Sequence, residues 1–261
     1  MSRKFKFDKD PLALGADMYS KGSITINPGV TVLVGCNGSG KSTFLRIIKD
    51  NVNHDKNNRK IFVFDYDNQN DGSSVSVSEA VWNGDIKFAA VAATSSEGEN
   101  ISLNLGKLID KIGECVKIHS DAEEIWIMLD AVDSGYSIDN IDMLKRLFDI
   151  ILKDSRCSNM DIYIVVSANS YEMARGENCL YVAAMEYVNF SDYEEYRNFI
   201  LNSFKRKEER VKKERENNEI RKELRREKRK TKKDIRHMSF EEIREQRKGK
   251  TEQDEQTTET S

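Results

Sequence analysis

Several signals that would place a chain in a familiar class are scarce or missing from these 261 residues. The cysteines stand far apart and form no C-x-x-C pair: Cys36, Cys115, Cys157 and Cys179. This spacing argues against a zinc site and a disulfide framework, and it suits a reducing compartment. No run of about 18 apolar residues could span a membrane, and no long apolar segment follows the basic N-terminus. We therefore expect a cytoplasmic protein that is neither exported nor embedded in a membrane.

Charge is distributed unevenly along the chain. The net charge is −3 at pH 7, but residues 205–250 hold 21 Lys and Arg against 11 Asp and Glu, which gives +10. Residues 251–261 carry −4, so that residues 1–204 carry −9. We expect three parts: a globular domain in residues 1–190, a charged, basic helical tail in 191–250, and a disordered acidic C-terminus in 251–261.

The most informative stretch is residues 30–50, where a run of β-formers leads into a glycine-rich turn and a helix. Its spacing, Gly35-x-x-x-x-Gly40-Lys41-Ser42, is that of a phosphate-binding loop, or Walker A motif. Glycines let successive N–H groups converge on phosphate oxygens, and the helix N-terminus favours the same anion. Lys41 would reach the β- and γ-phosphates of ATP, and the Ser42 hydroxyl would bind Mg²⁺. The expected nucleotide contacts are Gly35, Cys36, Asn37, Gly38, Ser39, Gly40, Lys41, Ser42 and Thr43.

Apolar segments alternate with helical patterns along the rest of the domain. Strands are expected at 4–7, 23–26, 60–66, 125–130, 161–167 and 180–188, and helices at 76–92, 100–118 and 138–153. Continuous apolar strands alternating with helices indicate an α/β fold with a mostly parallel sheet covered on both faces. Asp130 closes the strand at 125–130, where a carboxylate beside a phosphate loop would hold Mg²⁺ through water. The alternative is a strand-terminal Asp that faces solvent.

Three segments together resemble the ABC-type ATPase superfamily: GCNGSGKST at 35–43, SEGE at 96–99 and IMLDAVDSG at 127–135. The resemblance covers roughly residues 20–190. It is greatest to the soluble branch with the SMC and RecF-type DNA-repair ATPases, and to small ATP-binding proteins of bacteriophages. It implies a P-loop NTPase that binds ATP and Mg²⁺.

The resemblance also implies an ATP-dependent homodimer. The signature loop of one subunit, with Ser96 and Gly98, would close over the ATP held by the other. Gln69 would be the lid glutamine that contacts Mg²⁺. The alternatives are that Ser96 is only the N-cap of a helix and that Gln69 is an ordinary loop residue.

Two positions depart from the family pattern. The glutamate that would act as general base is Ala131 here, and Ser167-Ala168-Asn169-Ser170 stands where the switch histidine is expected. A methyl group cannot accept a proton, whereas Asn169 can hydrogen-bond a γ-phosphate but cannot act as an acid or base. A general base contributes about 10²–10⁴-fold, so we expect slow ATP hydrolysis, with Asp133 as a candidate for recruiting the water. The alternatives are a non-hydrolysing ATP-dependent switch or scaffold and, less favoured, the ATPase subunit of a transporter.

The basic tail should begin as a helix and then lose its apolar face. Ser191-Asp192-Tyr193-Glu194 reads as a capping box, but few apolar residues follow Phe204, so no strong coiled coil is expected. Phe240 is the only aromatic residue in 205–250, so base stacking is not supported. The tail can still bind DNA or RNA by neutralising phosphates. The alternative is a solvated helix held by its own i,i+4 ion pairs.

Overall fold

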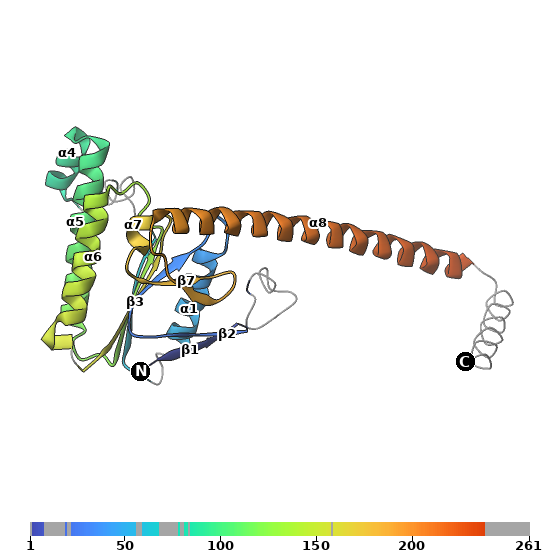
Figure 1. Ribbon diagram of the computed structural model, residues 1–261, viewed down its shortest axis with the longest axis horizontal. Coiled ribbons are helices and arrows are strands. Elements are labelled where there is room, and N and C mark those ends of the chain that lie inside the picture. The colour runs from blue at the N-terminus through green and yellow to red at the C-terminus, as the bar shows by residue number, and fades with distance from the viewer. Residues whose placement is uncertain are drawn as a thin grey trace. The chain divides into compact units, whose positions relative to one another are not determined.

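The computed structural model describes residues 2–7, 19, 22–55, 59–67, 78, 81–82, 84–157 and 159–237. The chain divides into two compact units, Met1–Lys205 and Arg206–Ser261. The elements in chain order are β1 (Arg3–Lys6), β2 (Ser23–Ile26), β3 (Gly29–Val34), α1 (Lys41–Asp55), β4 (Ile61–Asp67), α4 (Ile86–Thr94), α5 (Glu97–Ile118), β5 (Glu124–Asp130), α6 (Ile138–Lys153), η1 (Ser155–Cys157), β6 (Asp161–Ser167), α7 (Tyr171–Ala174), β7 (Asn178–Tyr181), β8 (Glu186–Val188) and α8 (Tyr193–His237) (Figure 1).

The centre of the first unit is a six-stranded sheet in the order β4-β5-β6-β3-β7-β8. Every neighbouring pair is parallel except β7 and β8. Helix α1 covers one face of the sheet, and α5 and α6 cover the other (Figure 1). This arrangement confirms the predicted α/β fold with a mostly parallel sheet.

Successive side chains along a strand point to opposite faces of the sheet, so each packs either in the layer beneath α1 or in the layer beneath α5 and α6. On β5, Trp126 and Met128 pack in the α1 layer with Phe44. Ile125 and Ile127 point the other way, into the layer beneath α5 and α6. Both faces of the central strands are therefore buried, as the continuous apolar runs predict.

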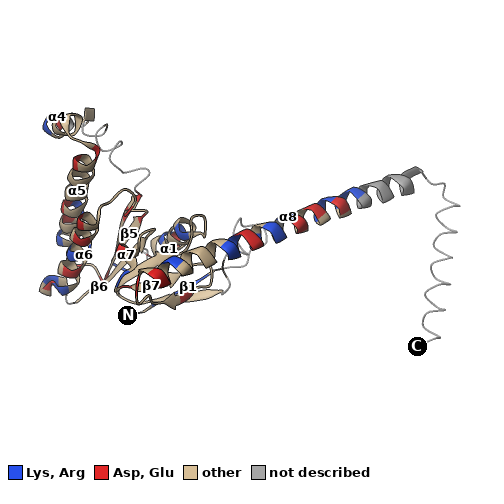
Figure 2. Cartoon of the chain, turned by 45° about the horizontal axis from the view of Figure 1, so that its top comes forward, with Lys and Arg blue, Asp and Glu red and all other residues tan. Residues whose placement is uncertain are grey.

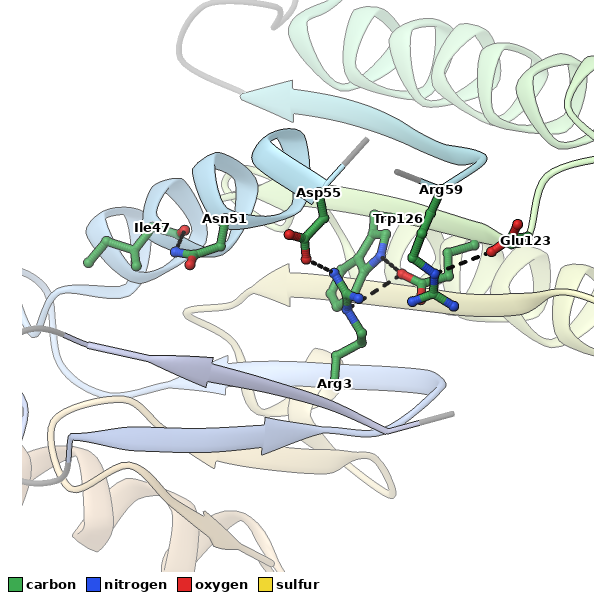
Figure 3. A network of polar contacts seen from close by, with 8 residues as sticks. Arg3, Ile47, Asn51, Asp55, Arg59, Glu123 and Trp126 are labelled. Atoms are coloured by element: carbon green, nitrogen blue, oxygen red, sulfur yellow. Dashed lines mark hydrogen bonds and ion pairs between the residues drawn. The ribbon is translucent and has the colours of Figure 1, made fainter. Parts of the chain in front are cut away.

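Arg3 connects the antiparallel pair β1 and β2 to the amino end of β5 and the end of α1 (Figure 3). Arg3 donates to Asp55 at 2.5 Å, and its Nε lies 3.6 Å from a carboxylate oxygen of Glu124. Glu124 is completely buried, and it also accepts hydrogen bonds from Arg59 at 2.5 Å and from the Trp126 indole at 3.1 Å. A buried carboxylate is costly unless it is paired. The two guanidinium groups and the indole N–H provide that pairing.

Two elements differ from the sequence-based expectation. Helix α4 begins at Ile86, so the helix expected over 76–92 is wrong at Gly84, whose φ of 75° suits the left-handed region and not a helix. Asp85 then caps α4 by accepting from Phe88 N–H at 3.2 Å. The strand expected over 180–188 is two strands, β7 and β8, which pair antiparallel across a turn containing Met185 at φ 52°.

Helix α8 begins with a cap one residue later than the predicted capping box. Asp192 accepts from Glu195 N–H at 2.9 Å. The Glu195 carboxylate accepts from the Ser191 N–H and hydroxyl, each at 2.8 Å, and these bonds lower its pKa. Glu195 therefore takes the role expected of Glu194, because Asp192 supplies the N-cap oxygen that Ser191 was expected to supply.

In the second unit, α8 continues as a charged helix to His237. Lysine and arginine alternate with aspartate and glutamate along the coloured part of its length (Figure 2). Ile220 and Leu224 are 53% and 50% exposed, so these apolar side chains contribute little buried surface. Among the helices that the structure describes, none is both long and apolar enough to cross a membrane. The predicted acidic C-terminus, 251–261, lies outside the described residues.

Candidate functional site

The phosphate-loop segment turns sharply between β3 and α1. Gly35, Gly38 and Gly40 have φ values of 142°, 71° and 100°, a region that L side chains rarely adopt. A β-carbon on Gly35 would also lie 2.7 Å from Ser39 Oγ, so this position has room only for glycine. Lys41 is largely buried and donates from Nζ to the Gly35 carbonyl at 2.8 Å, which folds its side chain back over the loop. The first turn of α1 holds no acidic residue, which leaves its N-terminus favourable to an anion.

Two residues outside the motif hold the two ends of the loop. The Tyr19 hydroxyl donates to the Gly40 carbonyl at 3.0 Å. The Ser203 hydroxyl, from α8, accepts from the Cys36 N–H at 3.3 Å. Neither residue carries a recognisable spacing, so sequence reasoning had no signal by which to find them.

Asp130 lies at the carboxyl end of β5 and is fixed by the neighbouring strand. The Ser167 hydroxyl, at the end of β6, donates to a carboxylate oxygen of Asp130. The same hydroxyl accepts from the Ala131 N–H at 2.8 Å. On the other side, the parallel register pairs Asp130 with Asp67 of β4. Asp67, Asp130 and Ser167 therefore form a row across three strand ends, and Asp67 and Ser167 were not among the predicted site residues.

A cavity of about 470 Å³ lies between Asp67 and Asp130 of this row and the start of α1. It is lined by Ser42, Thr43, Leu45, Arg46, Lys49, Asp65, Asp67 and Asp130. The structure thus brings Ser42 and Asp130 to one cavity, although they are far apart in the sequence. Hydroxyl and carboxylate oxygens are the donors that Mg²⁺ prefers, so this donor set fits the cation. Lys49 forms an ion pair with Asp65, and Asp67 and Asp130 line the same cavity.

Ala131, which stands where the family has a glutamate, has φ 51°. A non-glycine residue in this region is strained by about 1–3 kcal/mol. Its carbonyl accepts from the Ser134 N–H at 3.1 Å, so the chain turns tightly as it leaves β5. The tight turn after β5 is thus present although Ala131 lacks the carboxylate of the family's glutamate.

Asp133 does not have the environment of a free base. It is only 6% exposed, and one carboxylate oxygen accepts from the N–H groups of Asn169 and Ser170 at 2.8 and 2.7 Å. Its second oxygen is buried and has no hydrogen-bond partner among the described residues. One oxygen of Asp133 therefore holds the turn after β6, and the recruitment of water by this residue stays a prediction. Asn169 itself is exposed at that turn.

The segment expected to be the signature loop caps α5. Ser96 is the N-cap, and its hydroxyl accepts from Glu99 N–H at 3.4 Å. The Glu99 carboxylate accepts from the Ser96 N–H at 2.7 Å and hydroxyl at 2.9 Å, and these bonds lower its pKa. Ser96 and Gly98 are exposed and do not line the cavity of Ser42 and Asp130. The N-cap alternative is therefore correct as a description of the local structure, and a role toward a second subunit stays a prediction. Gln69 lies outside the described residues.

No protein-family model and no curated protein matches this chain. Among solved structures, it is similar to an ATP-binding cassette of an ABC transporter in its ADP conformation. The two share 13% sequence identity with a TM-score of 0.37, over 70% of this chain and 90% of that chain. At this identity and score the likeness is remote.

Proposed function

We propose that this chain is an ABC-type P-loop ATPase that binds ATP with Mg²⁺ and hydrolyses it slowly. The observation that carries the proposal is the loop from Gly35 to Ser42. Its three glycines with positive φ, its buried lysine folded onto the Gly35 carbonyl and its acid-free helix N-terminus together form a phosphate cradle. Asp130 lies across the adjoining cavity from this helix start.

In this site, the loop N–H groups and Lys41 would bind the β- and γ-phosphates. Ser42 and Asp130 would hold Mg²⁺, Asp130 being oriented by Ser167. When bound, the cation would supply positive charge to the phosphate oxygens. Asn169 and Gln69 are assigned to the γ-phosphate and the metal, respectively. Phosphoryl transfer depends mostly on such positioning and electrostatics.

The alternative function is an ATP-dependent switch that does not hydrolyse ATP. Ala131 supports it, because a methyl group offers no base to the attacking water. Steady-state release of phosphate from purified protein, measured beside ATP affinity by calorimetry, separates the two. ATP binding with slow release supports the ATPase, and binding without release supports the switch. No binding of ATP would overturn both.

Dimerisation is the second part of the proposal. Ser96 and Gly98 are exposed at the start of α5 and outside the nucleotide cavity, which is where residues acting on the partner's ATP would have to be. Light scattering should show a dimer with ATP and Mg²⁺ and a monomer without them. Gly98→Arg, which places a large charged side chain at the proposed contact, should abolish the dimer and leave ATP affinity of the monomer unchanged. Dimerisation that is independent of ATP would contradict this part.

The third part concerns the tail and DNA or RNA. Residues 205–250 carry +10 along a charged helix, so contacts would go to phosphates without sequence preference. Two tails joined by a dimer would bind more tightly than either one alone. Fluorescence anisotropy over a salt series should show binding that is stronger with ATP and Mg²⁺ and that falls as salt rises. Truncation after Phe204 should remove the binding of DNA or RNA and retain ATP binding. Equal binding by truncated and full-length chains would leave the tail without this role.

A further inference from the structure

The beginning of α8 lies outside the segment that resembles known ATPases, yet it belongs to the first compact unit. Tyr196, Phe199 and Ser203 follow one another at spacings of three and four residues, so they share one face of the helix. Each contacts a different part of the first unit. We refer to these three residues as the α8 face.

Ser203 makes the direct contact with the phosphate loop. Its side chain is buried, the residue being 3% exposed, and its hydroxyl accepts the hydrogen bond of the Cys36 N–H. Cys36 is the first variable residue of the loop and is buried as well. A buried N–H without an acceptor is unfavourable. The position of the first loop peptide therefore depends on a side chain of α8.

Phe199 supports the same end of the loop through β7. Its ring meets the ring of Tyr181 edge to face, with centroids 4.9 Å apart. The Tyr181 ring in turn lies 3.5 Å from the point where a β-carbon on Gly35 would stand. Gly35, Tyr181 and Phe199 are thus packed in series from the loop to the helix.

Tyr196 packs beside the turn that follows β6. Its ring centroid is 5.7 Å from that of Tyr171, at the start of α7. Burial raises the pKa of the Tyr196 hydroxyl, and the nearby negative charge of Asp133 raises it further. Asp133 is the residue that holds the turn at 169–170. The α8 face therefore contacts the phosphate loop through Ser203 and the start of α7 through Tyr196.

We infer that Tyr196, Phe199 and Ser203 make the first turns of α8 a positioning element of the phosphate loop, so that ATP binding and the order of this helix segment are coupled. The inference rests on the proposed ATP site. A ligand that orders the N–H groups of the loop would also hold the Cys36 N–H in its hydrogen bond to the Ser203 hydroxyl. Coupling between two sites is reciprocal, so the helix must favour ATP binding as much as ATP favours the helix.

The test uses the full chain and two variants. Ser203→Ala removes the acceptor and leaves a residue with better helix propensity. Asn202→Ala is the matched control, since Asn202 is the exposed neighbour on the same helix. ATP affinity with Mg²⁺ is measured by calorimetry. Hydrogen exchange of peptides covering residues 196–205 is measured with and without ATP, and unfolding midpoints without nucleotide identify any general loss of folding.

Ser203→Ala should lower ATP affinity about fivefold, the effect of one net hydrogen bond, while Asn202→Ala leaves it unchanged. ATP should slow exchange at residues 196–205 in the wild type, and Ser203→Ala should reduce that protection. Unchanged exchange in the wild type on saturation with ATP would overturn the inference, and this measurement needs no variant. Equal affinity of Ser203→Ala and wild type would overturn it as well. If the wild type binds no ATP, it is the proposed function that fails.

Discussion

The Ser167 hydroxyl joins two strand ends of the site, because it donates to the Asp130 carboxylate and accepts from the Ala131 N–H. One small side chain therefore orients the expected metal ligand and satisfies the first peptide of the turn that leaves β5. Ser167 is itself almost completely buried. Its hydroxyl has little freedom to take any other direction.

Ser167→Ala should weaken both the fold and the metal site. Loss of the hydroxyl leaves the Ala131 N–H without its acceptor, which costs about 1–3 kcal/mol. The Asp130 carboxylate would also lose its fixed direction. We expect a lower free energy of unfolding in urea and weaker ATP binding in Mg²⁺, with a smaller change in its absence. A loss of affinity that is the same with and without Mg²⁺ would contradict the assigned role.

Ala131→Glu should accelerate ATP hydrolysis. The backbone at this position already accommodates a β-carbon at φ 51°, so the longer side chain adds no new backbone constraint. A restored general base contributes about 10²–10⁴-fold, and we expect a gain of at least about tenfold in turnover. Ala131→Gly is the control, because it relieves the positive φ without adding a carboxylate and should leave turnover unchanged. An equal gain in both variants would attribute the effect to backbone relief.

Asp67→Asn should reduce the affinity of the ATP site for a divalent cation. Asp67 is paired in register with Asp130 and lines the same cavity as Ser42. A neutral amide attracts the cation less, and we expect a loss of about tenfold. Mn²⁺ titration followed by electron paramagnetic resonance in the presence of ATP measures it. Asp65→Asn is the matched control, because Asp65 lines the same cavity but lies in register with Met128 and not with Asp130. Equal losses of Mn²⁺ affinity in the two variants would indicate a general effect of negative charge in the cavity.

The sequence predicted the sheet because its central strands are buried on both faces and are therefore continuous apolar runs. The strand expected at 161–167 and the helix at 138–153 agree with β6 and α6 to the residue. Elements near the surface were harder to place. The prediction of a helix over 76–92 did not take Gly84 into account, and the turn at Met185 contains no glycine that would indicate it from the sequence.

The site was predictable where a motif has fixed spacing, as in Gly35 to Ser42. The residues that hold the motif in place were not. Tyr19 and Ser203 reach the loop, and Ser167 reaches Asp130, from distant parts of the chain; each contributes a single hydroxyl. Such contacts depend on tertiary packing and leave no periodic signal in the sequence. Asp67 is a different case, since it ends an apolar strand as Asp130 does and could have been found by the same rule.

Lys41→Ala should remove tight ATP binding. The Lys41 ammonium group is folded over the loop, at 2.8 Å from the Gly35 carbonyl. A hydrogen bond to a charged group contributes about 1.5–3 kcal/mol, so the loss should be at least about tenfold by calorimetry. Lys49→Ala is the control, because Lys49 lines the same cavity but is paired with Asp65. Unchanged affinity in Lys41→Ala would remove the phosphate-loop assignment.

Asp133→Asn separates a structural carboxylate from a water-recruiting one. The wild-type carboxylate accepts two backbone N–H groups at the turn after β6. An amide can present its oxygen to them, but it loses the negative charge that strengthens both bonds. We therefore expect a loss of about 1–3 kcal/mol in unfolding free energy and, among folded molecules, turnover within about twofold of wild type. Urea unfolding and single-turnover phosphate release measure the two quantities. A fall in turnover of about 10²-fold or more, the scale of a lost general base, with stability unchanged, would show that Asp133 acts on the water.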